Sequence, residues 1–79
     1  MKVIININLK NGVLDPQGEA ISSALKTMGF KGVNSVRQGK TIELDLDSTD
    51  PKKALKTTKE MCENLLSNTV IEDYFIEIV

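Results

Sequence analysis

The sequence predicts an α+β fold in which four strands and two helices follow one another in the order β-α-β-β-α-β. Two segments, 2–9 and 40–46, alternate apolar and polar residues with a period of two, which is the pattern of a strand with one buried face. Two other segments place apolar residues at helical spacing, and each begins with an Asp-Pro pair. Asp as the capping residue and Pro at the first helical position are typical of helix N-termini.

The first strand is followed by a turn and a helix. One face of this strand carries Val3, Ile5, Ile7 and Leu9. Ile4 lies on the other face, which indicates that this side is not fully exposed to water. Asn11-Gly12 predicts a tight turn, and the first helix follows from Pro16 to Gly29. Glycine ends helices readily because it adopts the left-handed conformation without steric cost.

The middle of the chain predicts a β-hairpin and the second helix. Residues 33–37 form a less regular strand, Gln38-Gly39 a two-residue turn and 40–46 the third strand. Asp50-Pro51 begins the second helix, and residues 74–79 form the last strand. The apolar stripe of this helix comprises Ala54, Leu55, Thr58, Met61, Cys62, Leu65 and Leu66. This order is the split βαβ arrangement of ferredoxin-like folds, in which two helices cover one face of a four-stranded antiparallel sheet.

The last strand is apolar on both faces. We expect residues 1–79 to form one small domain, whose core is marginal at this length. A strand that is apolar on both sides is usually covered on both sides. Because the sequence supplies no third layer, we expect a second copy of the chain to cover it. The predicted self-association surface contains Ile4, Tyr74, Phe75, Ile76 and Ile78.

The composition argues against nucleic-acid binding and against secretion. Ten basic and eleven acidic residues give a formal net charge of −1, whereas nucleic-acid binding needs a basic face. Cys62 is the only cysteine, so no internal disulfide forms and a reducing compartment is favoured. No apolar run approaches the ~20 residues of a membrane helix. These observations predict a cytoplasmic protein without membrane or nucleic-acid partners.

The sequence offers no convincing catalytic or metal-binding group. It contains no histidine, which is the commonest general base and metal ligand. Cys62 falls within the helical apolar stripe, so packing is favoured over a role as nucleophile. Residues 45–50 resemble the start of a calcium loop, but Thr49 stands where that loop requires glycine. We therefore expect no catalytic, cofactor or metal site on this chain.

The loop before the first helix contains two large apolar residues, Val13 and Leu14. Two interpretations remain open. Val13 and Leu14 either pack under the domain as a hydrophobic staple for the helix, or contact a partner protein.

Three blocks of the sequence together resemble the PurS family, the small subunit of phosphoribosylformylglycinamidine synthase. The blocks are 9–18, which contains the apolar loop, 33–40, which follows the pattern V-x-x-V-R-x-G-K, and 62–74 near the C-terminus. The resemblance extends over the whole chain in the same order. One departure is Thr69, which stands where the family usually has proline. The substitution loosens the connection to the last strand.

The resemblance implies a non-catalytic subunit of an ATP-dependent C–N ligase in purine biosynthesis. In this family a large synthetase subunit (PurL type) binds ATP, magnesium and the ribonucleotide substrate, and a glutaminase subunit (PurQ type) releases ammonia. The small subunit self-associates as a dimer or a tetramer, bridges the other two subunits and assists ammonia transfer. The residues that we expect to contact the partner subunits are Asn11, Gly12, Val13, Leu14, Asp15, Arg37, Gly39 and Lys40.

A different class of protein shares the same element order. Small-molecule sensors of the ACT type bind amino acids at a glycine-containing first loop, and Asn11-Gly12 would then be the ligand turn. A sensor should bind one free amino acid, whereas a bridging subunit should bind none. A small enzyme acting alone is the third interpretation, and the lack of catalytic groups argues against it.

Overall fold

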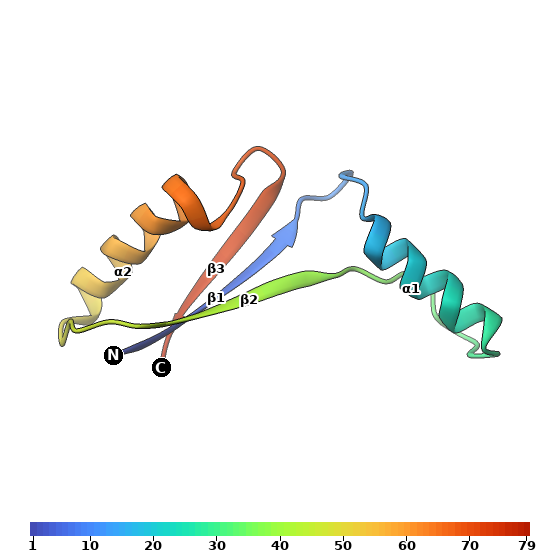
Figure 1. The fold of residues 1–79 in the computed structure, drawn as a ribbon, viewed down its shortest axis with the longest axis horizontal. Coiled ribbons are helices and arrows are strands. Elements are labelled where there is room, and N and C mark those ends of the chain that lie inside the picture. Colours follow the sequence, from blue (N-terminus) through green and yellow to red (C-terminus); the bar gives the residue numbers. More distant parts are fainter.

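The computed structural model describes residues 1–79, which form a three-stranded antiparallel sheet, two α-helices and one π-helical turn (Figure 1). In chain order the elements are β1 (Lys2–Leu9), α1 (Pro16–Thr27), β2 (Gly39–Asp45), α2 (Pro51–Met61), η1 (Cys62–Leu66, the π-helical turn) and β3 (Glu72–Ile78). The strand order is β2-β1-β3, so β1 is central and the two other strands each leave one edge unpaired.

The core lies between one face of the sheet and α2. The predicted alternation of β1 is confirmed, because Val3, Ile5 and Ile7 are fully buried. Helix α2 contributes the buried side chains of Ala54 and Thr58, and η1 contributes that of Cys62. Half-buried residues of the outer strands and their flanks surround these side chains: Ile42, Leu44, Leu46, Tyr74, Ile76 and Ile78.

The predicted four-stranded sheet is wrong, because residues 33–37 form no strand. The Gln38-Gly39 turn is also absent. The favoured two-residue hairpin turns need a positive φ at one or both central residues, but neither Gln38 nor Gly39 has one. Gly39 instead begins β2, paired with Asn8 of β1. The chain therefore runs straight into β2, and the outer edge of β2 has no partner strand.

The prediction that both helices cover the sheet is also wrong, because α1 lies beyond the end of the sheet (Figure 1). Residues 28–38 run back beside α1 toward β2, and we call residues 11–38 the arm. The arm gives the molecule a longest dimension of 49 Å and a radius of gyration of 16.0 Å. A compact chain of this length has a radius of gyration of about 12 Å. The arm therefore projects from the rest of the chain and packs against no sheet.

The predicted ends of α1 are confirmed, although its surroundings are not those expected. Asp15 caps the helix, and Gly29 at φ 92° follows its last turn. Ser22 of α1 is buried. The predicted fold would turn the helically spaced apolar residues of α1, among them Ile21 and Met28, toward the sheet. We call these residues the apolar stripe of α1, and in the structure Ile21 is 41% and Met28 71% exposed.

Helix α2 begins at the predicted Asp50-Pro51 pair and ends in the π-helical turn η1. The backbone N–H and the hydroxyl of Ser67 both donate to the carbonyl oxygen of Cys62, each at 3.1 Å. This wider turn buries Ser67 and leaves Leu65, a member of the predicted stripe, 82% exposed. Neither helix has the length and apolar character that crossing a membrane would require.

Candidate functional site: the base of the arm

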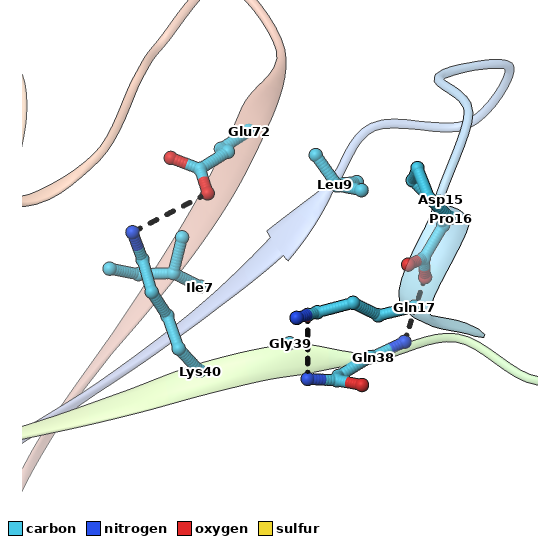
Figure 2. A pocket seen from close by; sticks show the side chains of 9 residues that line it. All are labelled: Ile7, Leu9, Asp15, Pro16, Gln17, Gln38, Gly39, Lys40 and Glu72. Carbon is cyan, nitrogen blue, oxygen red and sulfur yellow. Dashed lines mark hydrogen bonds and ion pairs between the residues drawn. The ribbon is translucent and has the colours of Figure 1, made fainter. Parts of the chain in front are cut away.

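Most of the predicted partner-contact residues meet where the arm leaves the sheet. We call this region, residues 9–15 and 37–40, the arm base. A cavity of about 430 Å³ opens here between the sheet and the start of α1 (Figure 2). Its lining comprises Ile7, Leu9, Asp15, Pro16, Gln17, Gln38, Gly39, Lys40 and Glu72. The structure thus brings together two segments that are more than twenty residues apart in the sequence.

Asp15 connects the two segments of the arm base. Its carboxylate is buried and uses both oxygen atoms. Oδ1 accepts from the backbone N–H of Gly18 at 2.9 Å, which caps α1, and Oδ2 accepts from the backbone N–H of Gln38 at 2.8 Å (Figure 2). The Nε atom of Arg37 lies 3.8 Å from Oδ2. The Gln38 and Gly18 N–H groups, with Arg37, hold the pKa of Asp15 below its usual value against the opposing effect of burial.

Arg37 binds the loop before α1, although 45% of its side chain remains exposed. Its Nη1 donates to the carbonyl oxygen of Val13 at 3.3 Å, and its Nη2 donates to those of Leu9 and Lys10 at 3.1 and 3.2 Å. The planar guanidinium group therefore bridges three carbonyls of one loop and a carboxylate. The sequence predicted that Arg37 contacts a partner subunit, but most of the N–H donors of its side chain are engaged within the chain.

The remaining polar groups of the cavity are paired with one another. Lys40 Nζ lies 3.6 Å from a carboxylate oxygen of Glu72, and the amide of Gln38 donates to that of Gln17 at 2.8 Å (Figure 2). No group of three or more acidic, cysteine or histidine residues is placed to hold a metal ion. Burial raises the pKa of the Cys62 thiol, which suppresses its nucleophilic thiolate form. The polar contacts of the arm base therefore hold its two segments together.

The loop of the arm base presents one large apolar side chain to solvent. The predicted Asn11-Gly12 turn is confirmed, with Gly12 at φ 83° and the N–H of Val13 donating to the carbonyl oxygen of Lys10 at 3.2 Å. Val13 is half-buried, whereas Leu14 is 75% exposed. Leu14 is thus not a staple for α1 in this structure.

The predicted self-association residues are divided between the two faces of the sheet. Ile4 and Phe75 lie on the face opposite α2, where Phe75 is exposed and Ile4 is half-buried. Tyr74, Ile76 and Ile78 lie on the α2 face, packed around the core. Sequence reasoning missed the exposed residues of the arm, namely Ile21, Met28 and Phe30. The helical spacing of Ile21 and Met28 was visible, whereas Phe30 follows the end of the helix. Spacing alone does not say which chain covers these residues.

Gly18 gives a test of how closely the arm is packed. A Cβ atom at this position would lie 2.6 Å from the carbonyl oxygen of Val36 and 2.6 Å from Asp15 Oδ2. In an open helix, replacing glycine with alanine stabilises by about 1 kcal/mol. We expect Gly18→Ala to have the opposite effect and to lower the melting temperature, because the backbone of the returning segment must move. A melting temperature equal to or above that of the wild type would contradict this packing.

The Asp15 carboxylate predicts loss of stability in acid. Its pKa is lowered in the folded chain, whereas it is about 3.9 in an unfolded chain. The contribution of the ionised Asp15 carboxylate to the free energy of unfolding is therefore fully present above about pH 4. It is lost as the pH falls through the lower pKa of the folded state. Urea midpoints measured from pH 7 to pH 3 should fall more steeply for the wild type than for Asp15→Asn. Parallel pH profiles would show that this carboxylate makes no contribution.

Comparison with known proteins places this arrangement in one family. The PurS family model, described as phosphoribosylformylglycinamidine (FGAM) synthase, matches residues 2–79. The phosphoribosylformylglycinamidine synthase subunit PurS of Bacillus subtilis (strain 168) is 48% identical over 77 residues, which cover 98% of this chain and 90% of that protein. The corresponding subunit of Synechocystis is 47% identical over 94% of this chain and 74% of that protein.

Solved structures agree with the sequence comparison. The crystal structure of Methanocaldococcus jannaschii PurS, a subunit of formylglycinamide ribonucleotide amidotransferase in the purine biosynthetic pathway, superposes with a TM-score of 0.87 at 39% identity. The superposition covers 96% of this chain and 92% of the Methanocaldococcus jannaschii chain. A chain from the structure of PurLQS from Thermotoga maritima gives a TM-score of 0.86 at 34% identity, over 96% and 93% of the two chains. The chain therefore belongs to the PurS family of phosphoribosylformylglycinamidine synthase subunits.

Proposed function

We propose that this chain is the non-catalytic small subunit of a phosphoribosylformylglycinamidine synthase complex, and that it bridges the synthetase and glutaminase subunits and assists ammonia transfer between them. The observation that carries the proposal is the match of almost the whole chain to a subunit within the PurLQS structure. The projecting arm supports it, because an element that packs on nothing in its own chain suits an assembly component. The PurS relatives give no support to the amino-acid-sensing alternative.

In this proposal the chemistry belongs to the other subunits. ATP and magnesium would bind to the large PurL-type subunit, and glutamine to the PurQ-type subunit. A reconstituted mixture of the three purified subunits should form the product from glutamine and ATP, whereas this chain alone should hydrolyse neither. We also retain the prediction of a cytoplasmic location, which the single free cysteine supports.

The arm is also the basis for proposing that the subunit self-associates. Isolated helices shorter than ~12–15 residues are marginal in water, and α1 has twelve residues. Its apolar stripe has no cover in a single chain. The high TM-scores extend over 96% of the chain, so the arm must superpose in the solved relatives as well. A second copy of the chain is the occupant that this argument favours.

The sheet offers the complementary surface. The outer edge of β2 is unpaired, and Ile42 and Leu44 on its α2 face are only half-buried. In the fold that the sequence predicts, residues 33–37 would pair with this edge and α1 would cover this face. A second copy can supply the same strand pairing and the same helical cover if the arm of each copy docks on the sheet of the other. Such an exchange is symmetric, as is usual for dimers.

The opposite face of the sheet gives a second proposed contact. Ile4 and Phe75 lie there among polar neighbours, on the face that neither α2 nor an exchanged arm would cover. Packing of two dimers through this face would give a tetramer. The arm and this face thus correspond to the two oligomeric states that the resemblance leaves open.

Leu14 is the residue that we propose contacts the large subunit. It lies at the surface of the arm base, beside the loop carbonyls that Arg37 binds. A large apolar side chain that becomes buried at a protein interface is a common source of binding energy. The proposed contact also includes Asn11, Gly12, Val13, Gly39 and Lys40, while Asp15 and Arg37 fix the shape of the loop.

Leu14→Asp tests this contact. The variant should weaken binding to the large subunit by about 2 kcal/mol, measured by calorimetry, and should leave the melting temperature almost unchanged because Leu14 is exposed. The matched control is Leu65→Asp, since Leu65 is equally exposed but lies at η1. Equal weakening by both variants, or wild-type binding by Leu14→Asp, would place the contact elsewhere.

A further inference from the structure

Two pairings compete for the outer edge of β2. This inference rests on the proposed exchange of arms between two copies. Residues 33–37 of the same chain can pair with β2 if Gln38-Gly39 makes a turn, or those of a second copy can pair with it if Gln38-Gly39 stays straight. Pairing within one chain has the advantage of high effective concentration. Exchange of arms between two copies therefore needs a structural feature that disfavours a turn at Gln38-Gly39.

The contacts of the arm base act directly on the two residues that precede β2. The backbone N–H of Gln38 donates to Asp15 Oδ2, and the guanidinium group of Arg37 is held by the carbonyls of Leu9, Lys10 and Val13. A turn at Gln38-Gly39 would reverse the chain and bring Arg37 beside Lys40. The Gln38 N–H and the Arg37 side chain would then leave these partners, so each contact favours the straight connection.

Gly39 contributes from the other side of the junction. It pairs with Asn8, and a Cβ atom on it would lie 2.6 Å from the carbonyl oxygen of Ile7. The sheet therefore begins immediately after Gln38. Gly39 is held in the ladder, where it cannot also serve as a turn residue.

We propose that Asp15 and Arg37 form a latch that keeps the connection into β2 straight, and that this latch makes two copies exchange arms instead of each chain closing on itself. In the closed form α1 would lie beside α2 on its own sheet, which is the four-stranded fold that the sequence predicts. The latch thus selects between two arrangements that share the same pairing pattern.

Asp50 provides a matched control, because it caps a helix without forming a latch. Like Asp15, it precedes a proline and accepts from a backbone N–H, that of Lys52 at 3.0 Å. Its side chain forms no hydrogen bond or ion pair with a distant segment. Asparagine caps helices as well as aspartate does. An amide has only one oxygen, however, so the new side chain in Asp15→Asn loses the bond from Gln38 if it keeps the cap on Gly18.

The test compares the wild type with Asp15→Asn, Arg37→Met and Asp50→Asn. Arg37→Met leaves both helix caps intact and so separates the latch from helix capping. The dimer dissociation constant is measured by sedimentation. The distance between spin labels on Lys26→Cys in α1 and Lys53→Cys in α2 is measured by electron double resonance, with labelled chains diluted in unlabelled protein. Cys62 remains in place, because it is buried and does not compete for the label.

The latch predicts that Asp15→Asn and Arg37→Met raise the dissociation constant by about tenfold or more, as expected for hydrogen bonds to charged groups. Both should also show a new population with a short label distance, as α1 closes beside α2. Asp50→Asn should match the wild type in both measurements. The latch would be overturned if the spin-label distance in Arg37→Met equals that of the wild type. It would also be overturned if Asp50→Asn changes the dissociation constant and the label distance in the same way as the latch variants.

The two readouts separate the latch from the proposed self-association. If the wild type is a monomer, self-association fails and the label distance alone decides. A long distance in the wild type that shortens in Arg37→Met still supports the latch. A short distance in the wild-type monomer overturns it.

Discussion

Ile21→Glu should convert the proposed dimer into monomers. Ile21 lies on the exposed stripe of α1, which the proposed exchange buries against a second copy. An unpaired carboxylate in that desolvated surface should cost at least about 3 kcal/mol, or more than a hundredfold in the dissociation constant. Glutamate is a good helix former, so α1 itself should remain intact. Sedimentation over a range of concentrations measures the change.

Phe75→Lys is the control for Ile21→Glu, because Phe75 is exposed on the opposite face of the sheet. Its charge should disrupt only the contact between dimers, so that assembly stops at the dimer. If Ile21→Glu assembles like the wild type, the arm is not the interface. If Phe75→Lys alone produces monomers, the open face of the sheet is the primary contact.

Ile5→Ala should cause the largest loss of stability. Ile5 is fully buried at the centre of β1, and truncating such a side chain costs about 2–5 kcal/mol. This is a large fraction of the stability of so small a domain. Urea unfolding at one fixed protein concentration measures this loss, since the proposed self-association would also contribute to stability.

Its neighbour Ile4 gives the matched control. Ile4 points to the opposite face and is only half-buried, so Ile4→Ala should have a much smaller effect on the urea midpoint. Equal losses in the two variants would contradict the burial of a single face of β1.

The sequence predicted most of the elements because their signals are local. The Asp-Pro pairs set the starts of α1 and α2, Gly29 follows the end of α1, and the period of two marks the buried face of β1. These signals depend on backbone geometry and on burial within a few residues, and they act in the same way whichever chain supplies the cover.

The arrangement of the arm could not be predicted for the same reason. The apolar stripe of α1 indicates that this surface becomes buried, but it does not indicate whether the same chain or a second copy covers it. Residues 33–37 likewise have the same sequence pattern whether they pair within one chain or between two chains. The arm base shows a further limit. Capping by Asp15 was predictable, but its second oxygen meets Gln38, which is twenty-three residues away. No local signal reports that distance.

The unequal edges of the sheet also bear on how far assembly can proceed. Arm exchange would consume the edge of β2, so that only β3 remains at both ends of the joined sheet. This last strand carries three acidic residues: Glu72, Asp73 and Glu77. Charged side chains on an edge strand discourage further strands from adding. The acidic β3 edges of two such dimers would repel each other, so the addition of further strands to the sheet would stop at the dimer and would not continue into a fibre.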